Sequence, residues 1–290
     1  MAPSTGERKL EISGTNKSRL TPDLTRLPTS VIPKRYELKL DVEPELKRYT
    51  GQVYIRIFIE GDVSSNTIWL HSKNLDILSA SIQFSQFALP FEASEILEVK
   101  SNYYRLIVFI NMLIFHQFII FCQVPEKAAI GLVFDNENVR LPKRTRAWIQ
   151  ITFKSALSQS LEGFYSNPYV DKNGCTKLGA CTLFAATEAR SCFPCFDEPN
   201  FKAIFALEVT VDQNLLVISN MPVMDSEKIN SRRKDTFEWS KEMSTYLVCI
   251  VIGQYDFIQT KANNRTLIRV FTPHGKLTPA PHMHTLIQGG

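Results

Sequence analysis

The chain has 290 residues, of which 44% are hydrophobic and 11% aromatic, and its formal net charge at pH 7 is +4. This length and composition are typical of a globular protein with a substantial core, and they exclude a wholly disordered chain. The charge is weak and no dense Lys/Arg run with interleaved aromatic residues is present, so we expect no nucleic-acid partner and find no reason to propose membrane binding.

The first predicted element is a polar leader. Residues 1–26 mix Ser, Thr, Gly, Lys and Asp with few large apolar residues. They lack the continuous apolar core of a signal peptide, and they contain acidic residues that a transit peptide avoids. We therefore expect a disordered leader on a cytoplasmic protein, in which the sequons at Asn16 and Asn264 stay unglycosylated.

From Leu27 onward, apolar and polar residues alternate with a period of two. The alternation is clearest over residues 36–42, 53–60 and 205–211. It predicts strands with one face on a core and the other toward solvent. Further short strands are expected at residues 66–71, 147–153, 236–240, 246–252 and 267–271. Such strands, separated by Gly, Pro, Asn and Asp, predict an all-β fold, an antiparallel β-sandwich or saddle of sheets.

One stretch, residues 101–123, is atypically apolar. Its central part, residues 106–122, reads LIVFINMLIFHQFIIFC and is interrupted only by Asn111, His116 and Gln117. Three interpretations remain open: a membrane span, for which the run is short; a pair of buried strands; or an insertion foreign to the fold, such as a translated intervening sequence. A free run of this kind would promote aggregation.

The sequence contains six cysteines. They are Cys122, Cys175, Cys181, Cys192, Cys195 and Cys249. Cys192 and Cys195 have C-x-x-C spacing, but no second C-x-x-C or His pair supplies the remaining ligands of a structural zinc site. Pro194 between them argues against a redox helix. We expect buried free thiols, with a disulfide and metal or redox chemistry as alternatives.

Residues 187–205, TEARSCFPCFDEPNFKAIF, combine charges, prolines and aromatic residues. Pro194 and Pro199 fix φ and stop helix propagation, and Phe193 and Phe196 can anchor the segment to a core. The pattern predicts a rigid connection between strands rather than a catalytic element.

Two charges of each sign lie within this segment, and they are Arg190, Asp197, Glu198 and Lys202. Arg190 can form a bidentate pair with Asp197 or Glu198, which stabilises more when it is partly buried. Asp197 and Glu198 are a poor acid–base pair, because adjacent residues of an extended segment point to opposite faces.

The same segment resembles the T-D-A-R-R-x-F-P-C-x-D-E-P-x-x-K-A-x-F block of the aminopeptidase N family of zinc peptidases. Further resemblances follow in family order at residues 26–39, 161–169, 219–223, 243–251, 253–260 and 269–276. The resemblance implies the family's N-terminal β domain over residues 27–276, with an unstructured tail at 277–290. The last two matches are most similar to the cytosolic puromycin-sensitive branch. Residues 101–123 do not resemble the family, which favours the foreign-insertion interpretation.

Family members remove N-terminal residues from peptides with one zinc ion, which is held by the histidines of an H-E-x-x-H helix and a later Glu. This sequence contains no His-Glu pair and no G-A-M-E-N segment. Its histidines are His71, His116, His274, His282 and His284. We expect no catalytic residue, cofactor-binding residue or metal ligand in this chain, and zinc only with the missing catalytic domain.

The resemblance also implies a substrate-pocket segment, T-Q-F-E, whose Gln and Glu contact the substrate's first residue and amine. The matching residues 182–185 read TLFA, so Leu183 and Ala185 stand at the two polar positions. Ser166 likewise replaces the Arg of the family's G-F-Y-R-S turn. Amine recognition is therefore in doubt even with a catalytic domain present.

The resemblance predicts the N-terminal domain of a zinc metalloaminopeptidase, which acts on peptide substrates only in the full-length protein and is inactive alone. Its expected partner is a catalytic domain or another protein. Two alternatives remain: a non-catalytic β-sandwich module that binds peptides or proteins, and a product that is unstable without the helical domain.

Overall fold

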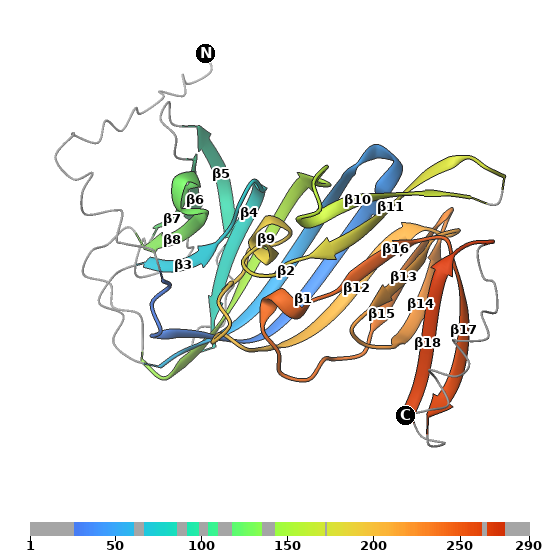
Figure 1. Ribbon diagram of the computed structural model, residues 1–290. Helices are drawn as coiled ribbons and strands as arrows, with labels where there is room; N and C mark the ends of the chain where they lie inside the picture. Colours follow the sequence, from blue (N-terminus) through green and yellow to red (C-terminus); the bar gives the residue numbers. More distant parts are fainter. Residues whose placement is uncertain are drawn as a thin grey trace, which may run out of the picture.

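The computed structural model describes residues 26–60, 67–85, 92–98, 104–109, 118–134, 143–171, 173–262 and 266–275. For residues 92–98, 104–109, 118–123, 133–134, 262 and 266 this covers the backbone only. The predicted leader, except Arg26, and the predicted tail at 277–290 lie outside the described residues. The described chain forms eighteen strands and four one-turn 3-10 segments (Figure 1).

The largest sheet has seven strands. Their order is β14 (Val223–Ile229), β15 (Arg232–Phe237), β12 (Ile204–Asp212), β1 (Val31–Glu43), β2 (Arg48–Ile59), β9 (Thr145–Ala156) and β4 (Asp76–Phe84). The alternation in β2 is regular: every second residue from Tyr49 to Ile59 is buried, and the residues between them are not. One face of this sheet therefore lies on the core.

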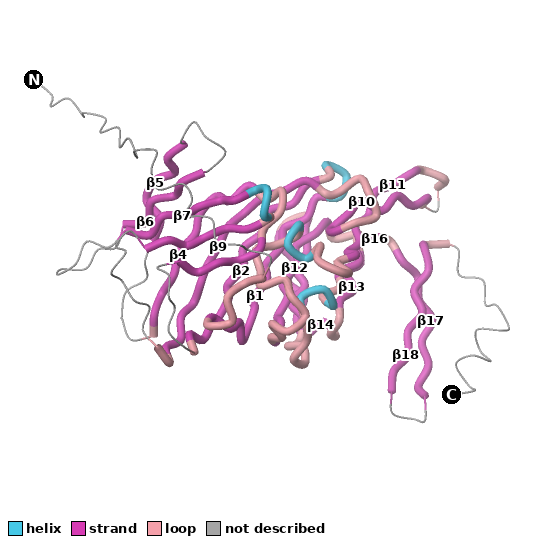
Figure 2. The backbone as a smooth tube through the Cα atoms, turned by 60° about the vertical axis from the view of Figure 1, so that its left-hand side comes forward, coloured by secondary structure: helices cyan, strands magenta, loops and turns pink. Residues whose placement is uncertain are grey.

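Three smaller sheets complete the fold. The four-stranded sheet has the order β10 (Gly163–Val170), β11 (Thr176–Leu183), β16 (Ile250–Gly253) and β13 (Leu216–Ser219). The five-stranded sheet has the order β3 (Thr67–His71), β8 (Ala129–Phe134), β7 (Phe118–Val124), β6 (Tyr104–Phe109) and β5 (Glu92–Glu98). The last two strands, β17 (Tyr255–Ala262) and β18 (Thr266–Pro273), form a hairpin sheet that extends from the end of the body opposite β5–β8 (Figures 1 and 2).

The core lies where the four-stranded sheet covers the seven-stranded one. Tyr49 of β2 and Phe164 of β10 bring the two sheets into contact, with ring centroids 5.2 Å apart. Both side chains are at most 2% exposed. Gly179 of β11 permits a close approach, because a Cβ there would collide with the backbone oxygen of Ile252 in β16. This architecture confirms the predicted all-β sandwich.

The structure corrects three details of the prediction. β1 and β12 pair in parallel, with Tyr36 opposite Phe205, so the large sheet is mixed rather than purely antiparallel. The strand expected at 236–240 ends at Phe237, because the Ser240 hydroxyl accepts a hydrogen bond from the backbone N–H of Phe205. The strand expected at 246–252 begins at Ile250, because residues 245–247 form a 3-10 turn.

The described parts of the apolar stretch form two strands. β6 and β7 pair antiparallel, with Arg105 opposite Cys122 and Phe109 opposite Phe118. Residues 110–117, and the side chains of both strands, lie outside the described part, so the predicted burial of this pair and its foreign origin stay predictions. Among the described residues, no helix has the length and hydrophobicity that a membrane crossing requires.

Candidate functional site

The predicted rigid segment crosses the interior of the protein, as expected. Phe193, Pro194 and Phe196 are buried. The backbone is held by core tyrosines: the Phe196 N–H donates to Tyr36 Oη at 3.0 Å, and Tyr49 Oη donates to the Cys192 carbonyl at 3.0 Å. Backbone groups of residues 188–203 that cannot join a strand ladder therefore find side-chain partners inside the core.

Arg190 pairs with Asp197, one of the two partners that the sequence offered. Arg190 Nε lies 3.0 Å from Asp197 Oδ2, and the side chains are 15% and 1% exposed, respectively. The pair is not bidentate between side chains, because Arg190 Nη2 donates to the backbone oxygen of Asp197 at 2.9 Å instead. Thr245 Oγ1 donates to the other carboxylate oxygen at 2.9 Å. These hydrogen bonds satisfy both oxygens of a buried charge.

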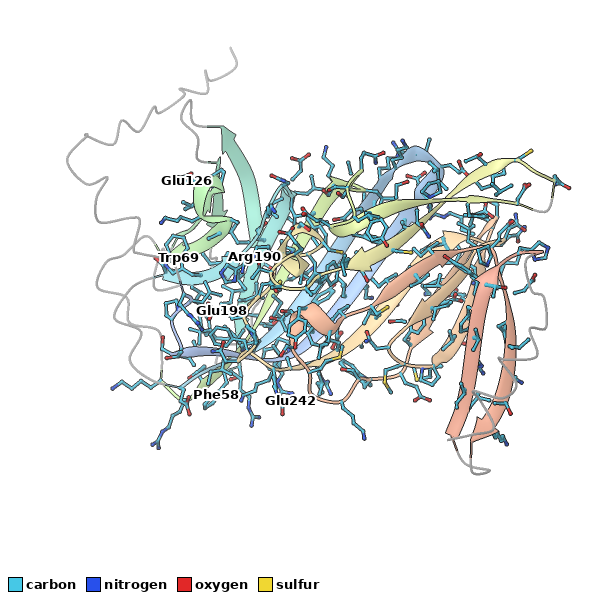
Figure 3. The ribbon with its side chains drawn as sticks, in the orientation of Figure 1. Phe58, Trp69, Glu126, Arg190, Glu198 and Glu242 are labelled. Carbon is cyan, nitrogen blue, oxygen red and sulfur yellow. The ribbon has the colours of Figure 1, made fainter. Side chains whose placement is uncertain are left out.

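His71, at the end of β3, completes this network. Its Nδ1 accepts the backbone N–H of Asp197 at 3.1 Å, and its own backbone exchanges two hydrogen bonds with Cys195. Burial, and secondly the nearby Arg190 guanidinium, lower the pKa of His71 to about 3. The imidazole is thus a neutral acceptor at physiological pH, and it helps to position the segment (Figure 3 shows Arg190 and Trp69 of β3 in this packed region).

Glu198 and Lys202 have different roles from Arg190 and Asp197. Glu198 Oε1 accepts the backbone N–H of Leu27 at 2.7 Å, and Oε2 lies 3.6 Å from Arg26 Nη1. Glu198 thereby fastens the start of the described chain to the segment. Lys202 is exposed. Asp197 and Glu198 have separate partners, so the two carboxylates do not share a proton and do not form an acid–base pair.

The two predicted substrate-pocket positions lie on the surface beside this network. Leu183 at the end of β11 is 48% exposed, and Ala185 is also exposed. Phe184 between them is only 2% exposed and packs edge-on against Phe193, with ring centroids 6.2 Å apart. The buried phenyl group holds the backbone so that both neighbouring side chains face outward. Neither a leucine nor an alanine side chain supplies a hydrogen-bond acceptor or a charge at these positions.

The predicted free thiols are confirmed for the five cysteines whose side chains are described, whereas the predicted full burial is confirmed only for the C-x-x-C pair. Cys192 and Cys195 are fully buried free thiols, and burial raises the pKa of both. Cys175 is also free but exposed, because it lies in the turn between β10 and β11. Cys181 and Cys249 are free and partly buried, and the side chain of Cys122 lies outside the described residues.

The donor groups of the described residues do not fit a zinc ion. Within those residues no group of three or more His, Cys, Asp or Glu side chains is placed to hold a metal. Nδ1 of His71 is occupied by a backbone donor, and His274 Nδ1 lies 2.6 Å from a single carboxylate, that of Asp256. His116, His282 and His284 lie outside the described part.

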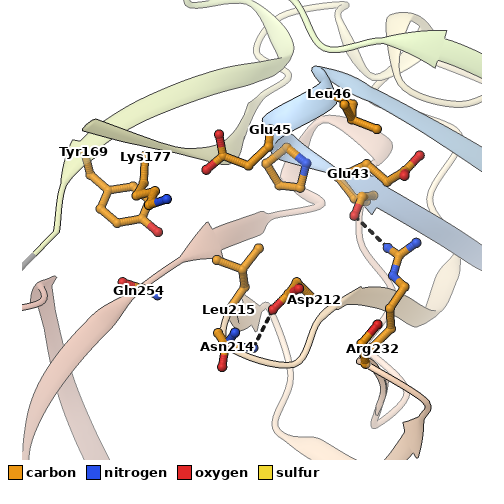
Figure 4. Close-up of a pocket in the computed structure, with 13 residues that line it drawn as sticks. Glu43, Glu45, Leu46, Tyr169, Lys177, Asp212, Asn214, Leu215, Arg232 and Gln254 are labelled. Carbon is orange, nitrogen blue, oxygen red and sulfur yellow. Dashed lines mark hydrogen bonds between the residues drawn. The ribbon is translucent and has the colours of Figure 1, made fainter. Parts of the chain in front are cut away.

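A cavity of about 400 Å³ that sequence reasoning missed opens at the tip of the β1–β2 hairpin (Figure 4). Two charged residues that line it have structural partners. Glu45 accepts the Leu178 backbone N–H at 3.2 Å. Arg232 Nη1 lies 2.5 Å from Asp41 Oδ1, and Arg232 Nη2 donates to the Val42 carbonyl. The cavity therefore shows no arrangement of groups for acid–base chemistry.

Sequence reasoning also missed the roles of His71, Tyr36, Tyr49 and Thr245. A signal was present for the two tyrosines, because both occupy core positions of alternating strands, where a phenolic hydroxyl needs a partner. Thr245 and His71 gave no comparable signal, since their partners are distant in sequence.

Comparison with known proteins agrees with these observations. Residues 32–247 match the Peptidase M1 N-terminal domain family. Aminopeptidase M1-A of Oryza sativa subsp. japonica is 32% identical over 254 residues, which are 87% of this chain and 25% of the relative. Aminopeptidase M1 of Arabidopsis thaliana is 32% identical over 252 residues, 87% of this chain and 25% of the relative.

A puromycin-sensitive aminopeptidase of Caenorhabditis elegans is 30% identical over 253 residues, which are 87% of this chain and 23% of that protein. The chain thus spans about a quarter of the length of the curated relatives that it matches. The rigid segment, the sheets around it and these matches agree with the resemblance drawn from the motifs. The chain belongs to the Peptidase M1 N-terminal domain family.

Proposed function

We propose that this chain acts as the structural N-terminal domain of a metalloaminopeptidase and that, alone, it binds no stoichiometric zinc and hydrolyses no peptide. The observation that carries the proposal is the absence of any His-Glu pair from the 290 residues, since the H-E-x-x-H helix supplies both metal ligands and the general base. The peptide substrate, the catalytic partner and a cytoplasmic location belong to the same proposal.

The proposal extends to Leu183 and Ala185, the two substrate-pocket positions, which we call the recognition surface. In the full-length setting, Leu183 and Ala185 would face the substrate's amine with no acceptor and no negative charge. An ammonium group moved from water to such a surface loses hydrogen bonds that nothing replaces. A catalytic domain combined with this chain would therefore bind amino-terminal substrates weakly.

The test is a metal analysis and an activity assay on the purified chain. We expect less zinc than one equivalent by mass spectrometry after dialysis, and no release of a fluorescent aminoacyl reporter above buffer. Arabidopsis thaliana Aminopeptidase M1, purified in the same way, serves as the active control. Reporter hydrolysis by this chain that a chelator abolishes and added zinc restores would overturn the proposal.

A non-catalytic binding module is the second candidate. The observation that favours it is the exposed apolar side chain of Leu183 where the matching family motif has a polar one. Micromolar binding of a peptide without cleavage, lost in Leu183→Gln, would support this candidate over the first.

A further inference from the structure

The outer face of the seven-stranded sheet carries two arginines and two tryptophans close together. Arg35 of β1 stands directly opposite Arg56 of β2, and Arg56 stands directly opposite Trp148 of β9. All three point away from the core, since each is next to a buried residue of its own strand and successive strand residues face opposite sides. Those buried neighbours are Tyr36, Ile55, Ile57, Ala147 and Ile149.

Each arginine lies over a tryptophan ring. The Arg35 guanidinium carbon is 4.1 Å from the ring centroid of Trp239, and that of Arg56 is 5.5 Å from the ring centroid of Trp148. Both rings remain 38% exposed. The loop that carries Trp239 is fixed beside β12 by the hydrogen bond between Ser240 and Phe205. We call Arg35, Arg56, Trp148 and Trp239 the Arg–Trp cluster.

The positive charge of this cluster is not neutralised by the described residues. Neither Arg35 nor Arg56 forms an ion pair or side-chain hydrogen bond with any of them, although both side chains are partly buried. Glu37 lies two residues along the same face of β1 without bonding either guanidinium. By contrast, lysines elsewhere on this face have acidic partners: Lys39 lies 3.9 Å from Glu208 and Lys154 lies 4.0 Å from Asp76.

This arrangement is unfavourable without a partner. Like charges directly opposite on neighbouring strands repel each other. Stacking on tryptophan leaves the N–H edge of each guanidinium free, and that edge matches a carboxylate in a planar, two-bond geometry. Trp and Arg are also the residues that contribute most to protein–protein binding energy.

We propose that the Arg–Trp cluster binds an acidic segment of a partner protein through its Asp or Glu carboxylates. A protein is favoured over a nucleic acid because the chain's net charge is only +4 and two lysines of this face, Lys39 and Lys154, have acidic partners, whereas a phosphate backbone needs a continuous basic track. The inference is independent of the proposed N-terminal-domain function, since it concerns the outer face of the seven-stranded sheet, whereas Leu183 ends β11 of the four-stranded sheet.

The test is fluorescence anisotropy with the full 290-residue chain at low ionic strength. The probe is a fluorescein-labelled peptide of about ten residues that alternates Glu and Ser, and the neutral probe has Gln for Glu. The variant is Arg35→Gln with Arg56→Gln. Its matched control is Lys39→Gln with Lys154→Gln, which removes the same two charges from the same sheet face. Circular dichroism verifies that both variants keep the native fold.

We expect the arginine variant to weaken binding of the acidic peptide at least about tenfold and the lysine control to change it less than about threefold. The neutral peptide should not bind. Four results would overturn the proposal: equal losses in both variants, equal binding of both peptides, no binding by the unsubstituted chain, or displacement of the peptide by a single-stranded oligonucleotide that binds more tightly.

Discussion

Two consecutive segments of this chain, residues 182–187 and residues 188–203, differ sharply in what surrounds them. The later segment is buried at its centre, residues 192–198, where the Asp197 carboxylate pairs with Arg190 and accepts a hydrogen bond from Thr245, and His71 of β3 accepts the Asp197 backbone N–H. In the earlier segment Leu183 and residues 185–187 are exposed, Thr182 is partly buried and Phe184 is buried. The residues that hold the fold are therefore present in full, while the two positions that the family resemblance assigns to substrate carry side chains without polar groups.

The difference shows that, within one motif, the buried residues are constrained by folding and the exposed residues are not. A buried ion pair tolerates little change, because removal of one partner leaves an uncompensated charge. An exposed position such as Leu183 can change without cost to folding. The domain's architecture therefore does not depend on which side chains stand at the two positions that the family resemblance assigns to the substrate.

The largest expected effect on stability separates two neighbouring residues, buried Phe184 and exposed Leu183. Phe184→Ala should lower the free energy of unfolding by about 3–5 kcal/mol, because it leaves a cavity against Phe193. Leu183→Ala, at the 48% exposed neighbour, should cost less than about 1 kcal/mol. Urea unfolding followed by tryptophan fluorescence measures both, and equal losses would show that Leu183 is also structural.

The second effect concerns the buried pair. Asp197→Asn should cost about 3 kcal/mol, because Arg190 is left partly buried without its counter-charge. Its matched control is Asp76→Asn, which removes a 76% exposed carboxylate 4.0 Å from Lys154 and should cost less than about 0.5 kcal/mol. Thermal unfolding measures both variants, and equal decreases in Tm would show that the network around Asp197 does not stabilise the segment.

The third prediction concerns pH. The folded-state pKa of His71 is about 3, against an ordinary value of 6.5, so between these values the unfolded chain binds more protons than the folded one. Stability is therefore fully present above about pH 6.5 and is lost as pH falls toward 3, with a slope of at most about 1.4 kcal/mol per pH unit from this group. His71→Asn keeps an acceptor for the Asp197 N–H and removes the titration.

The measurement is urea unfolding at several pH values between 4 and 7, read as the difference between the native chain and His71→Asn. Carboxylates contribute nearly equally to both proteins, so the difference isolates the imidazole. Parallel pH curves would show that His71 is accessible to protons in the folded state.

The smallest expected effect is on the recognition surface. Leu183→Gln with Ala185→Glu should change the free energy of unfolding by less than about 0.5 kcal/mol, since both side chains face solvent. Chemical denaturation of the double variant measures this. A loss of several kcal/mol would mean that these positions are constrained by packing and not by recognition.

Much of the fold could be predicted from local sequence pattern. Period-two alternation in residues 36–42, 53–60 and 205–211 gave strands β1, β2 and β12, because each buries one face. The parallel pairing of β1 with β12 joins residues about 170 apart, for example Arg35 and Ile204, and no local pattern encodes it. The 3-10 turn at Thr245 was missed in the same way, and the hydrogen bond from Thr245 to Asp197 likewise joins residues that are distant in sequence.

The candidate site divides in the same way. The pair of Arg190 with Asp197 was predictable from proximity along the chain and from their opposite charges. The choice of Asp197 over Glu198 was not, because it depends on which carboxylate faces Thr245 and which faces Leu27. The exposure of Leu183 and Ala185 follows from burial of Phe184, which the three consecutive apolar residues 183–185 did not indicate, because no apolar–polar alternation is present there.

We propose above all that this chain supplies the architecture of the domain without its chemistry for substrate recognition. The most direct measurement replaces the matching quarter of Arabidopsis thaliana Aminopeptidase M1 with this chain, with and without Leu183→Gln and Ala185→Glu. The account predicts a folded, zinc-loaded chimera with a high KM for an aminoacyl reporter, which the double substitution lowers at least about tenfold. A chimera with unsubstituted Leu183 and Ala185 that cleaves the reporter as efficiently as the doubly substituted one would contradict it.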